Sequence, residues 1–227
     1  MKQVLAMVLL MLALPLIVAA APISGLVNTG LATPGQLEPS WTAFVTGVPY
    51  VTEDTLFPFS TDPGDAAWAW LANDSSSRWI TPQQSYATDG SKPDDAPGGY
   101  DWYLTFDLTG FDPATAMFTF RYLADNHLAQ VQLNGNQVFV GPGLGSTEAL
   151  AWSGSYLINS GFQSGLNTLY VQTLNSSVPE GTFGNPAGLR FEFLSSSVAA
   201  AAPIPEPATF GLAGLALLGV AICRRQS

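Results

Sequence analysis

The residues that could do chemistry in this 227-residue chain are not arranged as a catalytic device. His127 is the only histidine and Cys223 the only cysteine, so a Ser-His-Asp triad would need His127 as its base, and no serine lies in a Gly-x-Ser-x-Gly motif. A zinc site would need more histidine or cysteine ligands. Acidic residues offer pairs for glycoside cleavage, but no motif selects one pair. We therefore predict that the protein is not an enzyme, and a glycoside hydrolase stays as an alternative.

Aromatic and polar side chains in the predicted loops suit the binding of sugars. Exposed Trp and Tyr rings stack on the apolar face of a sugar ring, and Asp and Asn side chains bond its hydroxyl groups. The candidate ligand-binding residues are Trp68, Trp70, Trp79, Trp152, Tyr86, Asp125 and Asn126. Core packing is the competing interpretation for most of the six tryptophans, and hydrogen bonds to the backbone are the alternative for Asp125, Asn126 and Asn134.

An acidic loop offers a second kind of site. Its candidate metal ligands are Asp89, Asp94, Asp95 and Asp101. Carboxylates are the ligands that Ca²⁺ prefers, but the spacing does not match an EF-hand, and Asp-Gly and Asp-Pro pairs also form plain turns. We expect no required cofactor, with structural calcium as the alternative to solvated turns.

The elements that position these residues are predicted to be strands, because the apolar pattern has a period of two. In residues 100–109 apolar side chains alternate with polar ones, which places Trp102 in the core. Further strands are predicted over residues 117–123, 166–174 and 188–194, and Asn134-Gly135 predicts a hairpin between residues 130–133 and 136–140. No segment has a helical period and no 40-residue repeat occurs, so the sequence predicts an all-β sandwich.

Two further features concern this sandwich. The N-terminal third, which contains Trp41 and residues 77–82, is expected to supply its first strands, because no linker separates a second domain. Arg121 and Arg190 interrupt otherwise apolar strands, and we expect them to pair with acids such as Asp107 or Glu192.

Apolar segments at both chain ends read as sorting signals. Lys2, the apolar residues 4–18 and the small residues before Pro22 form the three parts of a secretory signal peptide, with cleavage expected after Ala20. Residues 195–204 form a Ser-, Ala- and Pro-rich linker, and residues 208–223 a transmembrane helix. The helix lies between Pro205, Glu206 and Pro207 on one side and Arg224 and Arg225 on the other. The arginine pair keeps this end cytoplasmic; a plain tail anchor is the alternative.

This tail resembles the PEP-CTERM sorting signal of Gram-negative bacteria at the Pro-Glu-Pro triplet, the Gly-rich apolar helix and the arginine pair. The resemblance implies transit to the inner membrane, recognition by an exosortase, removal of the tail, and release or surface attachment. It also implies a setting of extracellular polysaccharide production, as in a biofilm matrix.

The middle of the chain resembles the galactose-binding-like jelly roll. The similarity lies in Asp125-Asn126, residues 131–135, residues 161–169 and residues 188–192. It implies a jelly-roll sandwich over residues 21–194, a fold that occurs in sugar-binding modules and that often carries structural calcium.

The exported part, residues 21–202, has four basic and sixteen acidic residues, a net charge of −12, and no cysteine. Such a charge argues against binding nucleic acid. The sequence therefore predicts an exported surface or matrix protein that binds polysaccharide. A structural matrix protein without a specific ligand is the alternative of another class.

Overall fold

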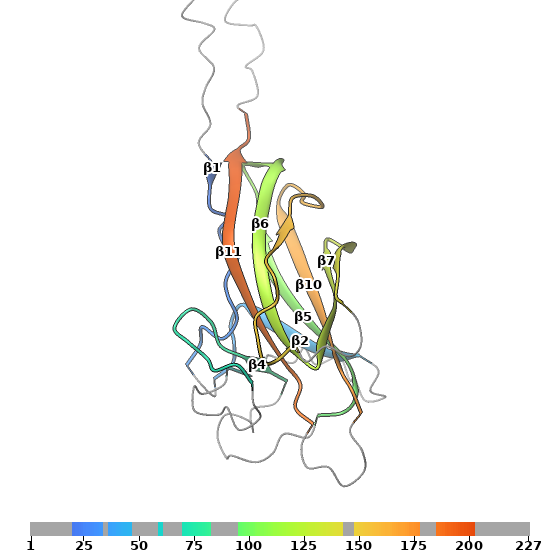
Figure 1. The fold of residues 1–227 in the computed structure, drawn as a ribbon. Coiled ribbons are helices and arrows are strands. Elements are labelled where there is room, and N and C mark those ends of the chain that lie inside the picture. The colour runs from blue at the N-terminus through green and yellow to red at the C-terminus, as the bar shows by residue number, and fades with distance from the viewer. Residues whose placement is uncertain are drawn as a thin grey trace, which may run out of the picture.

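The computed structural model describes residues 20–33, 36–46, 59–60, 70–82, 95–142, 148–177 and 185–202. In these ranges the chain forms strands and no helix, and the strands make two sheets that face each other (Figure 1). The predicted signal helix and transmembrane helix fall on residues outside these ranges. Within the described part, no helix is long and apolar enough to cross a membrane.

One sheet, called sheet B here, contains the strands predicted with the greatest regularity. Its strand order is β2-β5-β10-β7-β8, with every neighbour antiparallel. The strands are β2 (Trp41–Thr46), β5 (Gly98–Asp107), β10 (Leu166–Asn175), β7 (His127–Leu133) and β8 (Asn136–Val140). The β7–β8 hairpin turns at Asn134 and Gly135, whose φ angles of 54° and 79° fit the predicted type I′ turn.

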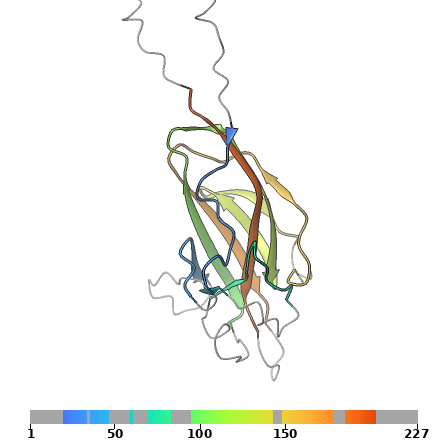
Figure 2. The same cartoon turned by 90° about the vertical axis from the view of Figure 1, so that its left-hand side faces the viewer.

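The second sheet, sheet A, is built around two long strands. Its order is β3-β4-β11-β6-β9, and β1 pairs with β11. The strands are β1 (Ala20–Ala21), β3 (Phe59–Ser60), β4 (Ile80–Thr81), β6 (Phe111–Asp125), β9 (Tyr156–Ile158) and β11 (Gly188–Ala200). β6 and β11 run antiparallel along almost their whole length and lie side by side in Figure 1; Figure 2 has β11 at the front.

The chain passes back and forth between the sheets. β5 lies in sheet B, β6 in sheet A, β7 and β8 in sheet B, β9 in sheet A, β10 in sheet B and β11 in sheet A. Strands that follow one another in sequence therefore mostly face each other across the core, which is the jelly-roll pattern of a β-sandwich. The predicted all-β jelly-roll sandwich is confirmed.

The long strands of sheet A extend beyond the sequence prediction. β11 continues to Ala200, and its Ser195 and Ser197 lie opposite Thr119 and Met117 of β6. Residues 195–200, which the sequence assigned to a linker, therefore belong to the sheet. β6 likewise begins at Phe111, before the predicted start at residue 117, so Asp112-Pro113 lies inside the strand. Pairing with a distant strand overrides the weak strand preference of serine, alanine and proline.

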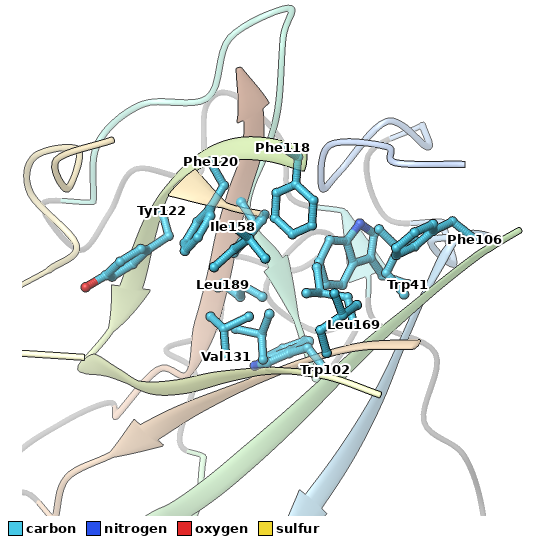
Figure 3. Close-up of a cluster of buried hydrophobic side chains, with 14 of the residues drawn as sticks. Trp41, Trp102, Phe106, Phe118, Phe120, Tyr122, Val131, Ile158, Leu169 and Leu189 are labelled. Atoms are coloured by element: carbon cyan, nitrogen blue, oxygen red, sulfur yellow. The ribbon is translucent and has the colours of Figure 1, made fainter. Parts of the chain in front are cut away.

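The core lies between the sheets and is dominated by aromatic rings (Figure 3). Trp41 and Trp102 are completely buried, and Trp102 Nε1 donates a 3.0 Å hydrogen bond to Thr173 Oγ1. Phe120 of β6 stacks on Phe191 of β11 at 4.7 Å. Among the described residues, the buried side chains of this core lie between Ile23 and Val198, within residues 21–202.

Both ends of the described chain leave the sandwich at the same end. Ala20 lies opposite Ala199, and the amide of Ala201 donates to the carbonyl of Gly110. Asp125 lies opposite Gly188, at the other end of the same pair of long strands. Ala199 to Ala202, which precede the sorting motif, therefore lie at the end of sheet A opposite to Asp125.

Candidate functional site

The outward face of sheet B carries a connected set of polar and aromatic side chains. Alternation along the strands places Trp102, Val131 and Val171 in the core and sends their neighbours outward. We call the outward set the glutamine–tyrosine face; it consists of Asp101, Tyr103, Gln130, Gln132, Gln137, Tyr170 and Gln172. Asp101 is buried, Gln137 is exposed, and the remaining five side chains are partly exposed.

Strand register arranges this face in two rows that cross the sheet. In one row Asp101, Gln172 and Gln130 lie opposite one another on β5, β10 and β7. In the other row Tyr103, Tyr170, Gln132 and Gln137 lie opposite one another on β5, β10, β7 and β8. The tyrosine rings are in contact, with centroids 5.2 Å apart. The face therefore has an aromatic end on β5 and β10 and an amide end on β7 and β8.

A chain of side-chain hydrogen bonds connects the rows. Gln137 Nε2 and Gln132 Nε2 both donate to Gln130 Oε1, at 2.8 and 3.0 Å. Gln130 Nε2 donates to Gln172 Oε1 at 3.1 Å, and Gln172 Nε2 donates to Asp101 Oδ1 at 3.0 Å. Every donor in this chain points toward Asp101, so the carboxylate fixes the orientation of each amide group.

The aspartate and the tyrosines of this face have perturbed acidities. Burial raises the pKa of Asp101, and the hydrogen bonds from Tyr170 and Gln172 offset this only in part. Burial also raises the pKa of Tyr170, with a further contribution from its 2.8 Å hydrogen bond to Asp101 Oδ1. The pKa of Tyr103 is raised by burial and by the charge of Asp101. Both phenols therefore keep their protons at neutral pH, and that of Tyr170 donates to Asp101.

The amide end of the face retains unused hydrogen-bonding capacity. An amide carries two N–H donors and one carbonyl acceptor. Within the described residues, no hydrogen bond reaches Oε1 of Gln132 or of Gln137, and each donates through a single Nε2 contact. These partly exposed groups can bond the hydroxyl groups of a ligand, while the tyrosine rings offer an apolar surface.

The outward face of sheet A is different where residues 70–82 pack against it, because charged side chains pair with one another there. Arg121 donates to Glu192 Oε2 through Nε at 2.7 Å and through its NH2 nitrogen at 2.6 Å. Arg190, which is completely buried, donates to Ser77 Oγ and to the Ala72 carbonyl at 2.6 Å and to Asp74 at 2.7 Å. The expected pairing with Glu192 is confirmed for both arginines, since an NH2 nitrogen of Arg190 also lies 3.7 Å from Glu192 Oε1.

Glu192 pairs with the arginines in a buried position, whereas Asp107 does not pair with them. Glu192 is only 3% exposed, because Ser77 also donates to it and residues 70–82 cover it. Asp107 pairs with neither arginine and instead accepts hydrogen bonds from the amide and hydroxyl of Thr109. It lies on β5 in sheet B, and the arginines lie in sheet A.

Three of the predicted sugar-binding tryptophans pack in one cluster, and one of them, Trp152, covers these charges. We call Trp70, Trp79, Trp152, Arg121 and Arg190 the tryptophan–arginine cluster. Trp152 lies over both guanidinium groups, at 4.0 Å from Arg121 and 4.6 Å from Arg190. Trp79 is 1% exposed and stacks on the partly exposed Trp70 at 4.3 Å. Trp79 therefore packs in the interior, which is the alternative that the sequence left open. Trp70 and Trp152 are partly exposed, but each contacts other side chains of this protein.

Trp70 also contacts the predicted polar group at the start of β7. Its Nε1 donates a 2.6 Å hydrogen bond to Asp125 Oδ2. Burial raises the pKa of Asp125 to about 6, although this hydrogen bond lowers it. The neighbouring glycine is essential to the contact, since a Cβ on Gly188 would lie 2.8 Å from the Trp70 ring. Asp125 therefore supports the packing of Trp70.

Asn126 and Asn134, at the two ends of β7, both form hydrogen bonds with the backbone. Asn126 Oδ1 accepts from the amide of Ser176 at 2.6 Å. Asn134 Oδ1 accepts from the amide of Thr168, and its Nδ2 donates to the carbonyl of Gly161. The alternative that these side chains bond backbone applies to both.

The predicted metal ligands are only partly within the described residues. Of these, Asp89 and Asp94 lie outside the described residues. Two of the predicted sugar-binding residues, Trp68 and Tyr86, also lie outside them. Asp95 Oδ2 accepts from the amide of Ala187 at 2.8 Å, and Asp101 belongs to the glutamine–tyrosine face. Among the described residues, no group of three or more His, Cys, Asp or Glu side chains is placed to hold a metal ion. The calcium prediction stays a prediction.

Sequence reasoning missed the glutamine–tyrosine face, apart from Asp101, which it assigned to a metal. The usable signal was present: Gln130 and Gln132 alternate with Val131 and Leu133, and Tyr170 and Gln172 alternate with Leu169 and Val171. Such alternation identifies outward residues. Alternation does not show that four strands bring these outward residues together on one face.

Comparisons with known proteins identify the tail. Residues 203–225 match the family model described as the PEP-CTERM protein-sorting motif, which confirms the predicted resemblance. The motif indicates a protein that is exported and processed at the membrane for the cell surface. Pro205, Glu206, Pro207, Arg224 and Arg225 all lie in the matched segment. No curated protein matches the chain.

Two solved structures similar to this chain are carbohydrate-binding modules. One is the native structure of a family 35 carbohydrate binding module from Clostridium thermocellum, with 16% identity, covering 53% of this chain and 81% of that chain at a TM-score of 0.30. The other, from an environmental isolate, has 12% identity and covers 70% of this chain and 98% of that chain at a TM-score of 0.28. Similarities of this size do not identify a ligand for this chain.

Proposed function

We propose that this protein is a non-catalytic binding module for an uncharged polysaccharide and that it binds through the glutamine–tyrosine face. The observation that carries the proposal is the connected amide chain of Gln130, Gln132, Gln137 and Gln172 beside the tyrosine pair. Sugar recognition needs a ring-stacking surface together with oriented donors and acceptors. These two requirements meet on this one partly exposed face.

The distribution of charge supports an uncharged ligand. Between Asp125 and Glu180 the chain has a single charged residue, Glu148, and this stretch supplies β7, β8, β9 and β10. Glu148 accepts hydrogen bonds from Tyr122 and from the amide of Leu128. The exported part as a whole has a net charge of −12, which repels polyanions. A neutral polysaccharide is not repelled by this charge.

The sorting tail supports an extracellular ligand. We propose that an exosortase of a Gram-negative cell removes the tail after the inner membrane has held it, and that the sandwich then acts at the cell surface or in the matrix. Replacing Glu206 by alanine should leave the protein in the membrane fraction at its uncut mass, because the triplet is the feature next to the apolar segment. Fractionation and mass spectrometry check this, and unchanged release would contradict it.

Retention of residues 21–202 on insoluble or gel-embedded polysaccharides tests the ligand. Tyr170→Ala and Gln172→Ala should each weaken retention about tenfold, because a lost oriented contact is worth about 1.4 kcal/mol. Gln163→Ala is the matched control, because Gln163 is an exposed glutamine in the turn before β10 and lies off the face. Absence of retention on every neutral polysaccharide would contradict the proposal and favour a structural matrix protein.

A further inference from the structure

We infer that the glutamine–tyrosine face binds an internal stretch of several consecutive sugar units, laid across the strands, and does not recognise a chain end. The inference rests on the proposed function and specifies the form of its ligand. It follows from the length of the face, from its ends and from the repetition of its chemistry.

The length of the face exceeds that of one sugar ring. The row from Tyr103 to Gln137 crosses β5, β10, β7 and β8. Neighbouring strands lie about 4.8 Å apart, so three spacings make a row of about 14 Å. A single pyranose ring covers only part of this length. A ligand that contacts both the tyrosine end and the amide end therefore spans several units.

The ends of the row are open within the described part of the chain. At the amide end, β8 is the last strand of sheet B, Gln137 is exposed, and the side chain of Val140 is 64% exposed. At the tyrosine end, the next residue in the row is the partly exposed Thr42 of β2, opposite Tyr103. Recognition of a terminal sugar needs side chains that enclose it, and none of these described residues forms such a wall.

The same amide group recurs on the neighbouring strands β10 and β7 and twice along β7. Gln172, Gln130 and Gln132 present the same amide group from neighbouring positions, all oriented by one chain of hydrogen bonds that ends on Asp101. A repeated donor and acceptor suits a repeated pattern of hydroxyl groups. A site for one distinctive terminal group would need different partners at each position.

A series of linear neutral oligosaccharides tests this inference. The probes are glucose chains with β-1,3, β-1,4 or α-1,4 links and β-1,4 chains of mannose, xylose or N-acetylglucosamine, each from one to six units and immobilised by the reducing end. For residues 21–202, affinity should rise by about tenfold or more from one to four units and then level off. Methyl capping of the non-reducing end should change it less than about twofold.

Variants at the two ends of the row sharpen the test. Gln137→Ala should weaken binding of the longer chains about threefold and leave disaccharide binding unchanged, since a short ligand stacks on the tyrosine end. Tyr103→Ala should weaken both, and Gln163→Ala should weaken neither.

The outcomes separate the inference from the proposed function. Equal affinity for one unit and six, or loss of binding on capping, overturns the inference while sugar binding stands. Absence of binding to every oligosaccharide, together with no retention on any polysaccharide, overturns the proposed function itself and this inference with it.

Discussion

The two outward faces of the sandwich treat their polar side chains in opposite ways. On sheet A, Arg190 and Glu192 are buried beneath residues 70–82, and Trp152 packs on the guanidinium groups. On sheet B, Gln130 and Gln172 bond each other and stay partly exposed. On sheet A, charged and aromatic groups bind residues 70–82 to the sheet. On sheet B, uncharged groups stay accessible.

This difference separates stability from binding. Buried ion pairs and stacked tryptophans are strongly coupled to the fold, so their loss should lower the free energy of unfolding. Amides on a partly exposed face contribute little to folding, so their loss should mainly affect a ligand. Measuring both stability and polysaccharide retention of a variant therefore distinguishes the two roles.

The largest effect is expected for Arg190→Met. Its guanidinium group contacts Ser77, Ala72 and Asp74 in a completely buried position. Removing it leaves buried acceptors without a partner, so the free energy of unfolding should fall by about 3 kcal/mol in urea titrations. The half-exposed partner gives the control: Asp74→Asn should cost well under half as much. If Arg190→Met lost polysaccharide retention but kept the unfolding midpoint of the natural protein, Arg190 would serve binding and not stability.

A smaller loss of stability is expected for Trp152→Ala. The ring is partly exposed and covers Arg121 and Arg190. Losing its packing and its cation–π contacts should destabilise the protein by about 2 kcal/mol. Retention of polysaccharide should be the same as for the natural sequence at a temperature where both are folded. Weakened retention would instead place the ligand on the tryptophan–arginine cluster, as the sequence suggested.

An effect of similar size is expected for Asp125→Asn, but it depends on pH. The pKa of Asp125 in the folded protein is raised to about 6, so the folded state holds this proton more tightly than the unfolded state. The resulting stabilisation is complete below the unfolded pKa, near 3.8, and is lost as pH rises through about 6. Asparagine does not titrate.

Urea unfolding of both proteins between pH 4 and pH 7 measures this effect. Relative to the variant, the natural protein should lose about 2 kcal/mol of stability over this range. A constant difference between the two proteins would show that Asp125 does not change its protonation on unfolding.

Prediction from sequence succeeded where local pattern decides the structure. The alternation around Trp102 and the Asn134-Gly135 turn each involve residues close in sequence, and both predictions are confirmed. The sorting motif is also a local pattern. The end of β11 was predicted too early, because Ser195 and Ser197 form a strand only through their pairing with β6.

The binding candidates show where such prediction ends. A tryptophan in a predicted loop has the same local sequence whether it faces solvent or covers an arginine. Trp79 and Trp152 are near Arg190 only because the fold brings together segments that are far apart in the chain. The residues of the glutamine–tyrosine face likewise come from four strands.

By itself, the sequence determined which side of each strand faces the core, where one hairpin turns and where the chain is sent, because these depend on spacing along the chain. Only the tertiary structure decided which outward face is covered and which is left open. The physical reason is that a period of two distinguishes inward from outward but treats all outward side chains alike. Residues 70–82 pack against β11 on sheet A, whereas Tyr170 and the four glutamines of sheet B stay partly or fully exposed.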